Sequence, residues 1–284
     1  MHPSGTARRC LLLMAFFTIA SRAELRPDLE YGRVGNFRLL LDANIPDTPG
    51  PHAAAILVHG GGWVRGDRKN TMAPLFAPLT NAGIAWFSIS YRLAGDVPAQ
   101  LLLSTAVDDV RQAVSYVKAH AAEFRIDPDR IALIGESAGA QLAAMAALRP
   151  GSEGAVKAVV SIYGPNDLAG IAQNAPQIPE RWREKMKGNP WVDLLMAGLN
   201  AQSPVNYLHA GMPPFLLIHG TKDPFVPYDQ SVSLCKLIQK AGGSCSLFSV
   251  EGGVHGLRRW ESSGLTAYKA YMVRWLQQQL GATV

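Results

Sequence analysis

The chain has 284 residues, of which 48% are hydrophobic and 17% are charged, and its formal net charge is +5. This length and composition predict one large globular domain and exclude an intrinsically disordered chain. Arg8, Arg9 and Arg22 lie within residues 1–23, which hold no acid, so the remainder carries only +2. Such a small charge gives no reason to expect a nucleic-acid partner.

Residues 1–23 have the organisation of a secretory signal peptide. The Arg8-Arg9 pair precedes an apolar run, Cys10–Ala20, and Ser21-Arg22-Ala23 offers small residues at the two positions that a signal peptidase reads. We therefore expect cleavage after Ala23 and a secreted or periplasmic protein. The run is too short to span a bilayer stably, so no stable membrane span is expected after processing. An uncleaved helix close to the membrane is the alternative.

Residues 24–284 alternate between strand-like and helix-like patterns and are expected to form one catalytic domain. Short apolar runs bounded by Gly, Pro or polar residues predict buried strands. These runs are Phe37–Leu41, Ala54–His59, Ala85–Ser90, Ile131–Gly135, Ala158–Tyr163, Phe215–Gly220 and Leu247–Val250. Helical stretches lie between them, such as Ser104–His120, whose apolar residues recur every three or four positions. The pattern predicts the α/β class, a mostly parallel sheet with helices on both faces.

The last predicted helix follows Ser262 and Ser263, which are candidate N-caps. It ends before Gly281, a residue type that commonly terminates helices. Its apolar positions, including Met272 and Trp275, are expected to pack on the sheet.

Residues 165–207 interrupt the alternation of strands and helices. This insertion is rich in Asn, Pro and Gly and contains Trp182, Trp191 and Leu194-Leu195-Met196. Because connections of this length commonly serve function, we interpret it as a small cap over the active site. A helical excursion that only packs on the surface is the alternative.

The sequence Gly135-Glu136-Ser137-Ala138-Gly139 predicts a nucleophile elbow. It follows a predicted strand and precedes Ala140–Leu148, a strong helix-forming stretch, which is the context that the motif requires. A sharp turn from strand to helix strains the middle residue and exposes its hydroxyl, and its neighbours must therefore be small. We predict Ser137 as the nucleophile. Glu136 is a candidate residue of the substrate pocket.

The sequence His59-Gly60-Gly61-Gly62-Trp63 follows another predicted strand and predicts an oxyanion loop. Glycines let backbone N–H groups turn toward a developing negative charge. We assign the oxyanion hole to the N–H groups of Gly61, Gly62 and Ala138, and Trp63 is a candidate pocket residue. His59 is expected to brace the loop. A phosphate-binding loop is excluded because no Lys-Ser/Thr pair follows the glycines.

His255 is the predicted base because it follows the last predicted strand in a glycine-flanked loop. His52 precedes its strand, and therefore lies at the end of the sheet opposite to the one where catalytic residues are expected. His219 lies within a predicted strand, which indicates a structural role.

Asp223 is the predicted acid because it follows strand Phe215–Gly220, in a turn that Pro224 stiffens. Glu251 is the rival, but it lies close to His255 along the chain and is expected to be exposed. Asp167 also follows a strand, but comes too early in the chain. The order Ser, Asp, His is the order found in α/β-hydrolases.

Cys235 and Cys245 are the two cysteines beyond the predicted signal peptide, and they flank a Gly-Gly turn. In an oxidising compartment they are able to form a disulfide. Two buried thiols that pack as small hydrophobic groups are equally compatible with the sequence.

These motifs together resemble the hormone-sensitive-lipase-like esterases of the α/β-hydrolase fold. Trp63–Asp67, Ser90–Leu93, Ile126–Ile131 and Ser203–Asn206 make the chain more similar to the bacterial acetylxylan/feruloyl esterase-like branch. The resemblance runs from about residue 30 to the C-terminus. It implies a serine carboxylesterase with no cofactor or metal, acting on small-molecule or carbohydrate esters with short-chain or aromatic acyl groups.

Two other functions remain open. Arylformamidases share the His-Gly-Gly-x-Trp signature, although their work inside cells disagrees with a signal peptide. A non-catalytic binding protein on this fold is the alternative from another class, and such a protein has typically lost one residue of its triad. The sequence keeps serine, aspartate and histidine at all three positions.

Overall fold

The computed structural model describes residues 23–152, 156–174, 180–181, 184 and 187–282. The predicted signal peptide, apart from Ala23, and Trp182 therefore lie outside the described residues.

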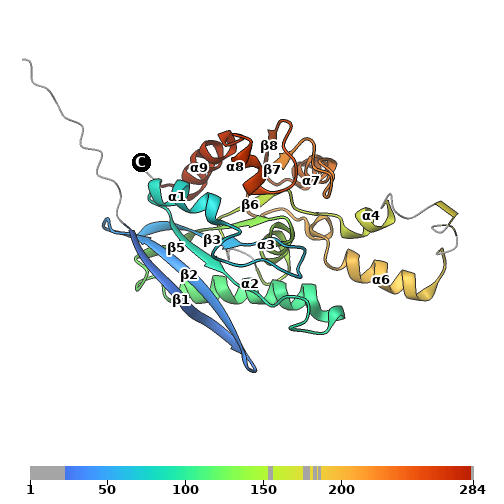
Figure 1. Cartoon of the computed structure of the whole chain (residues 1–284), viewed down its shortest axis with the longest axis horizontal. Helices are drawn as coiled ribbons and strands as arrows, with labels where there is room; N and C mark the ends of the chain where they lie inside the picture. Colours follow the sequence, from blue (N-terminus) through green and yellow to red (C-terminus); the bar gives the residue numbers. More distant parts are fainter. Residues whose placement is uncertain (1–22, 153–155, 175–179, 182–183, 185–186, 283–284) are drawn as a thin grey trace, which may run out of the picture.

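An eight-stranded sheet forms the centre of the domain, in the order β1-β2-β4-β3-β5-β6-β7-β8 (Figure 1). Its strands are β1 (Ala23–Val34), β2 (Phe37–Pro46), β3 (His52–Val58), β4 (Ala85–Ile89), β5 (Ile126–Glu136), β6 (Ala158–Ile162), β7 (Phe215–Gly220) and β8 (Cys245–Val250). β2 runs antiparallel to β1 and to β4, and β3 to β8 pair in parallel. The predicted mostly parallel α/β sheet is confirmed.

Helices cover both faces of the sheet. They are α1 (Ala73–Asn81), α2 (Leu102–Ala119), α3 (Ala138–Leu148), α4 (Leu168–Gln173), α6 (Pro190–Asn200), α7 (Asp229–Lys240), α8 (Leu257–Ser262) and α9 (Ala267–Leu280), with 3-10 turns η1 (Ala99–Leu101) and η2 (Pro204–Tyr207). Buried residues of α2, α3 and α7 belong to one apolar cluster, and those of α1, α8 and α9 to the other. Figure 1 shows α1, α8 and α9 on one side of the sheet and α2 and α3 on the other.

The C-terminal region departs from the prediction. Ser262 is the last residue of α8 and Ser263 is its C-cap, so neither caps the last helix. Gly264, with a φ of +70°, turns the chain between α8 and α9, and α9 begins after Thr266. The predicted end before Gly281 is confirmed.

Residues 165–207 contain α4, α6 and η2, of which α4 and α6 extend away from the sheet (Figure 1). α6 buries none of its residues, and Trp191, Leu194 and Leu195 are exposed. Among the described residues, no helix is long and apolar enough to cross a bilayer.

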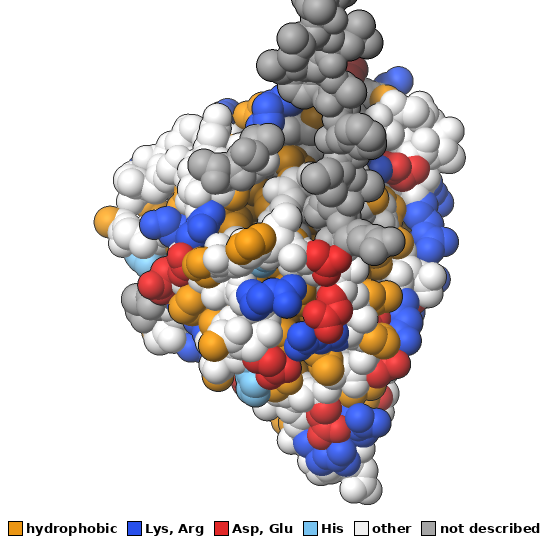
Figure 2. Space-filling view, turned by 90° about the vertical axis from the view of Figure 1, so that its left-hand side faces the viewer, with side chains coloured by type: hydrophobic (Ala, Val, Ile, Leu, Met, Phe, Trp, Pro, Cys, Tyr) orange, Lys and Arg blue, Asp and Glu red, His pale blue; other side chains and the backbone are white. Residues whose placement is uncertain are grey.

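The face seen in Figure 2 carries acidic and basic side chains side by side. On the β1–β2 hairpin, Glu30 pairs with both Arg33 and Arg38. Over its whole length the hairpin carries four acidic and three basic side chains, so its charges nearly balance.

The structure pairs Cys235 with Cys245, with Cα atoms 5.5 Å apart, and so decides the alternative that the sequence leaves open. The bridge ties α7 to the start of β8 across ten residues.

Replacing both cysteines by alanine is expected to lower the free energy of unfolding by about 2–3 kcal/mol, because a closed loop of this length restricts the unfolded chain. Urea denaturation of the wild type and the Cys235→Ala/Cys245→Ala variant measures the difference. A reductant present during unfolding should destabilise only the wild type. Equal sensitivity of both proteins to the reductant would contradict the prediction.

Candidate active site

Ser137 lies at the turn between β5 and α3, with φ 53° and ψ −121°, a strained conformation for a residue with a side chain. A Cβ atom on Gly139 would lie 2.1 Å from the Val58 carbonyl oxygen. The turn therefore packs directly against the end of β3, and only glycine fits at Gly139. This is the steric arrangement that the Gly-x-Ser-x-Gly motif predicts.

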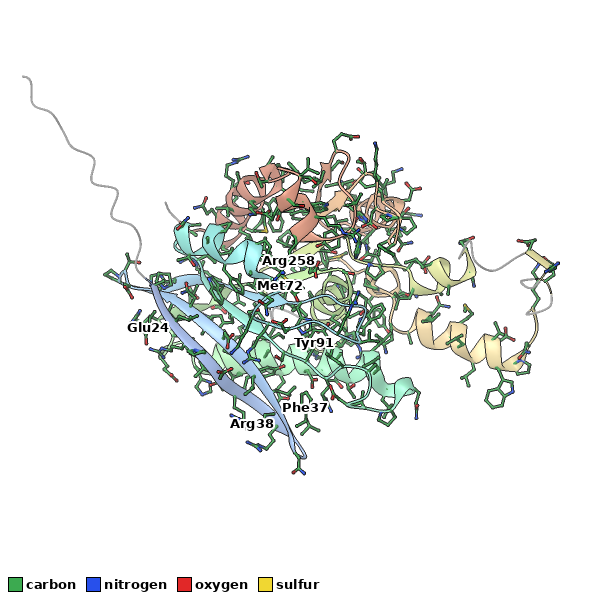
Figure 3. All side chains as sticks on the ribbon, in the orientation of Figure 1. Glu24, Phe37, Arg38, Met72, Tyr91 and Arg258 are labelled. Atoms are coloured by element: carbon green, nitrogen blue, oxygen red, sulfur yellow. A yellow bond between two sulfur atoms is a disulfide. The ribbon has the colours of Figure 1, made fainter. Side chains whose placement is uncertain are left out.

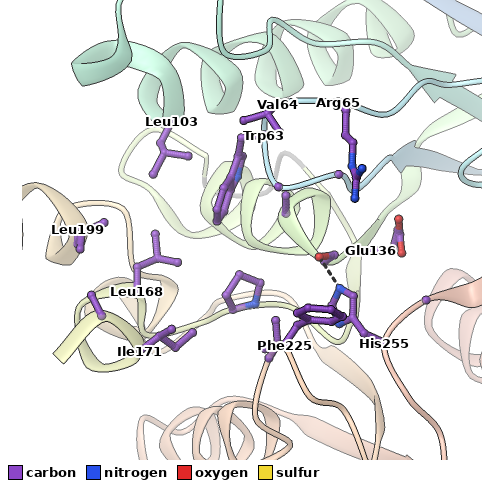
Figure 4. A pocket seen from close by; sticks show the side chains of 18 residues that line it. Trp63, Val64, Arg65, Leu103, Glu136, Leu168, Ile171, Leu199, Phe225 and His255 are labelled. Atoms are coloured by element: carbon purple, nitrogen blue, oxygen red, sulfur yellow. Dashed lines mark hydrogen bonds between the residues drawn. The ribbon is translucent and has the colours of Figure 1, made fainter. Parts of the chain in front are cut away.

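A chain of hydrogen bonds links three predicted residues across three loops. His255 Nε2 lies 2.9 Å from Ser137 Oγ, and His255 Nδ1 lies 2.6 Å from Asp223 Oδ2. Because a carboxylate only accepts, Nδ1 carries the proton and leaves Nε2 free to accept the Ser137 hydroxyl proton. The dashed line in Figure 4 marks the contact between His255 and Ser137. The geometry suits a nucleophile, a base and an orienting acid.

Asp223 is held by its own turn. Its Oδ1 accepts the backbone N–H groups of Phe225 and Val226, both at 2.9 Å. Burial alone would raise the pKa of Asp223, but the imidazoles of His219 and His255 and the amide of Val226 outweigh burial and hold this pKa far below its usual range. Asp223 therefore stays charged beside His255.

The other residues considered for the triad have partners of their own, and His219 also lies beside the triad acid, with its Nε2 3.6 Å from Asp223 Oδ2. His219 is fully buried, and its ring nitrogens contact Ser231 Oγ at 2.7 Å and the Val226 carbonyl at 3.0 Å. The exposed Glu251 accepts a hydrogen bond from Thr221, and Asp167 caps α4. The geometry thus agrees with the structural role predicted for His219.

The oxyanion loop follows β3 and lines the same cavity as Ser137. Gly61 has a φ of +121°, which L side chains rarely adopt. Gly61, Gly62 and Ala138 all border the cavity, and in the part of the chain that the structure describes their N–H groups have no acceptor. Free N–H groups at this place are available to a negatively charged oxygen.

Side chains around the loop hold it in place. The buried His59 ring donates through Nδ1 to the Gly60 carbonyl at 2.8 Å and stacks on Tyr91. Trp63 donates to Gln141 at 3.2 Å, and Gln141 donates to the Gln202 carbonyl at 2.7 Å. Gln141 therefore connects the loop to the insertion, a role that the sequence does not indicate.

A cavity of about 750 Å³ opens above Ser137. Its lining is mostly apolar and includes Trp63, Leu103, Leu168, Ile171, Leu199 and Phe225 (Figure 4). Leu168, Ile171 and Leu199 belong to the insertion, so this segment forms part of the cavity wall. Among the described residues, no group of three or more His, Cys, Asp or Glu side chains is arranged to hold a metal ion.

The sequence model of the BD-FAE family matches residues 41–238, a region that contains Ser137, Asp223 and the oxyanion loop. The chain belongs to the BD-FAE family. Curated relatives include esterase LipQ of Mycobacterium tuberculosis, 34% identical over 233 residues, which are 76% of this chain and 53% of LipQ. The probable carboxylic ester hydrolase LipM of the same organism is 33% identical, over 72% of this chain and 49% of LipM. The chain spans about half the length of these relatives.

Solved structures share the fold. A truncated carbohydrate esterase from gut microbiota has a TM-score of 0.74, at 24% identity, and the match covers 93% of this chain and 98% of the other. Esterase 2 of Thermogutta terrifontis has a TM-score of 0.70, at 23% identity, and the match covers 94% of each chain. Both similarities place this BD-FAE chain in the α/β-hydrolase fold.

Glu136 lines the cavity, as predicted, but its pairing with Tyr163 was not predicted from the sequence of this BD-FAE chain. Glu136 is 8% exposed, and it accepts from the Gly60 N–H at 3.2 Å and from the Tyr163 hydroxyl. The Tyr163 oxygen accepts the Leu257 N–H at 2.8 Å, and its ring packs on His255. Burial raises the pKa of Glu136. The pair joins the oxyanion loop to the histidine loop. In the sequence, Glu136 is marked by its place beside Ser137 and Tyr163 by its place at the end of a predicted strand, but nothing links the two residues.

Replacing Tyr163 by phenylalanine is expected to lower the free energy of unfolding by about 1–3 kcal/mol, because Leu257 loses its acceptor and Glu136 loses a donor. On a nitrophenyl ester, kcat should fall while KM changes little, because Tyr163 is fully buried. Steady-state kinetics and urea denaturation measure both. Tyr207→Phe, which removes an exposed hydroxyl hydrogen bond, is the control. Equal behaviour of the two variants would contradict the prediction.

Proposed function

We propose that this protein is a serine carboxylesterase that hydrolyses short-chain or aromatic acyl esters, including esters of carbohydrates. The observation that carries the proposal is the hydrogen-bonded chain Ser137–His255–Asp223, whose Ser137 and His255 line an apolar cavity. Free N–H groups of Gly61, Gly62 and Ala138 border the same cavity.

The proposed reaction is acyl transfer in two steps. His255 takes the proton from Ser137 as the Ser137 oxygen attacks the ester carbonyl. The oxyanion hole of Gly61, Gly62 and Ala138 stabilises the tetrahedral oxygen, and Asp223 stabilises the charged imidazole. His255 then returns the proton to the departing alcohol. Water, activated by the same histidine, releases the acid and restores the Ser137 hydroxyl.

The names of the relatives and the size of the cavity support the substrate class. The matching proteins carry the names esterase, carboxylic ester hydrolase and carbohydrate esterase. Volumes of 300–1,000 Å³ are typical of small-molecule pockets, and about 750 Å³ accommodates an aromatic acyl group.

A substrate panel with a covalent probe tests the proposal. The panel contains nitrophenyl acetate, butyrate and palmitate, methyl ferulate, and formylkynurenine as the arylformamidase substrate. Labelling with paraoxon, followed by mass spectrometry of the peptides, identifies the nucleophile. We expect the highest kcat/KM on acetate, butyrate or ferulate, and a phosphoryl group on Ser137 alone.

Each other outcome overturns part of the proposal. Activity only on palmitate would exclude the short or aromatic acyl class. Faster turnover of formylkynurenine than of any ester would identify an arylformamidase. If the protein hydrolyses none of the substrates and paraoxon does not label it, the protein is a non-catalytic binding protein.

We also propose that the protein is secreted or periplasmic, after cleavage of residues 1–23. The disulfide Cys235–Cys245 supports an oxidising compartment. Mass spectrometry of protein recovered outside the cytoplasm should find Glu24 at the N-terminus. A full-length chain confined to the cytoplasm would contradict this proposal.

A further inference from the structure

A second hollow, of about 520 Å³, opens beside the catalytic cavity. It shares the lining residues Arg65, Glu136 and Gly256 with that cavity, so the two hollows are adjacent. Arg258 and Arg259, which follow the histidine loop, line its other side. Two loops that carry parts of the active site therefore bring three arginines to one place.

Among the described residues, these arginines have no carboxylate partner. Within the described part of the chain, the guanidinium groups of Arg65 and Arg259 have no hydrogen bond or ion pair. Among the described residues, Arg258, labelled in Figure 3, donates only to the Asn70 carbonyl, at 3.2 Å. By contrast, Arg92 forms an ion pair with Asp109 at 2.6 Å.

The two acids of the hollow do not neutralise the arginines. Asp67 accepts the backbone N–H groups of Lys69 and Asn70, at 2.8 and 2.7 Å. Glu136 is occupied by Gly60 and Tyr163. Neither carboxylate lies within ion-pair distance of an arginine of the hollow, and three positive charges face two negative ones.

The position of Arg65 connects the hollow to the reaction. The Cγ atom of Arg65 packs against Gly61 of the oxyanion loop, and Figure 4 shows Arg65 pointing toward the side of the cavity where Glu136 lies. A group bound by these arginines is therefore close enough to belong to the same molecule as the ester bond at Ser137. Guanidinium groups match the planar, bidentate geometry of a carboxylate.

We propose that the hollow is a substrate subsite that binds a carboxylate carried by the ester. The preferred substrate then has two different parts, an apolar part in the cavity beside the insertion and an acidic part at Arg65, Arg258 and Arg259. This inference rests on the proposed esterase activity and adds the charge of the substrate to it.

Matched pairs of esters test the proposal on the whole protein. One pair, phenyl butyrate and 3-(butyryloxy)benzoate, places the carboxylate on the alcohol. The other, nitrophenyl butyrate and the nitrophenyl monoester of glutaric acid, places it on the acyl group. We expect kcat/KM to be about fivefold or more higher for the acidic member of at least one pair. In the wild type, 0.5 M NaCl should reduce this preference.

The Arg258→Gln/Arg259→Gln variant should lose most of the preference. Arg274→Gln is the matched control, because Arg274 is an exposed arginine on α9 that does not line the hollow. Equal kcat/KM for both members of both pairs in the wild type, or an unchanged preference in the double variant, would overturn the subsite. If Ser137→Ala still hydrolyses every ester as fast as the wild type, the esterase proposal itself fails.

Discussion

Ser137→Ala is expected to lower kcat on nitrophenyl butyrate by at least about 10⁴-fold. The variant keeps the apolar cavity and the oxyanion donors but has no oxygen to attack the carbonyl. His255 then has no proton to take, because its Nε2 contacts Ser137 Oγ at 2.9 Å. Substrate binding should be almost unchanged, since the lost hydroxyl is a small part of the cavity wall.

Burst kinetics and the steady-state rate, measured on purified protein, check this expectation. Ser115→Ala is the control, because Ser115 lies on the exposed face of α2. Both variants should unfold at the same urea concentration as the wild type. A Ser137→Ala protein that keeps a tenth of the wild-type kcat would exclude Ser137 as the nucleophile.

Asp223→Asn is expected to lower kcat by about 10⁴-fold with little change in KM. The carboxylate holds the proton of His255 on Nδ1, at 2.6 Å, and an amide at this position no longer fixes that tautomer or stabilises the charged ring. The backbone N–H groups of Phe225 and Val226 retain the side-chain oxygen as an acceptor, so the turn should survive.

The stability of the same variant, compared with that of the wild type, is expected to depend on pH. The pKa of Asp223 is lower in the folded protein than in the unfolded chain, so its ionisation stabilises the fold above about pH 3.9. This contribution is lost as the pH falls below that value toward the native pKa. The stability difference between the wild type and Asp223→Asn should therefore shrink in acid, which urea denaturation at pH 7 and pH 3 measures.

The variant Glu251→Gln tests which of the two candidate acids, Asp223 or Glu251, belongs to the triad. Glu251 is exposed, and within the part of the chain that the structure describes its side chain bonds only Thr221, so we expect this variant to keep kcat within about twofold of the wild type. A large loss of kcat in Glu251→Gln together with a small loss of kcat in Asp223→Asn would identify Glu251, and not Asp223, as the acid of the triad.

The sequence predicts the parts of the site that depend on local rules. Parallel strands end at one edge of the sheet, so residues in the loops that follow them, such as Ser137, Asp223 and His255, meet there. The small residues around Ser137 are visible in the sequence because the turn excludes side chains, as the contact of Gly139 with Val58 shows.

Features that depend on contacts between distant segments were not predictable. β1 buries only Tyr31 and contains Pro27 next to a register shift, so no apolar alternation marks it as a strand. The pair of Glu136 and Tyr163 exists only because β5 and β6 are neighbours. The predicted start of α9 was wrong because the two serines that resemble N-caps lie at the end of a separate short helix, α8.

The link through Gln141 has a consequence for engineering the protein. This side chain bonds Trp63 of the oxyanion loop and the Gln202 carbonyl just after α6. Exchanging the insertion for a longer or shorter one, in order to admit larger acyl groups, would shift that carbonyl and release the tryptophan. Substrate range and turnover are therefore mechanically coupled, and a useful graft must keep residue 202 in place.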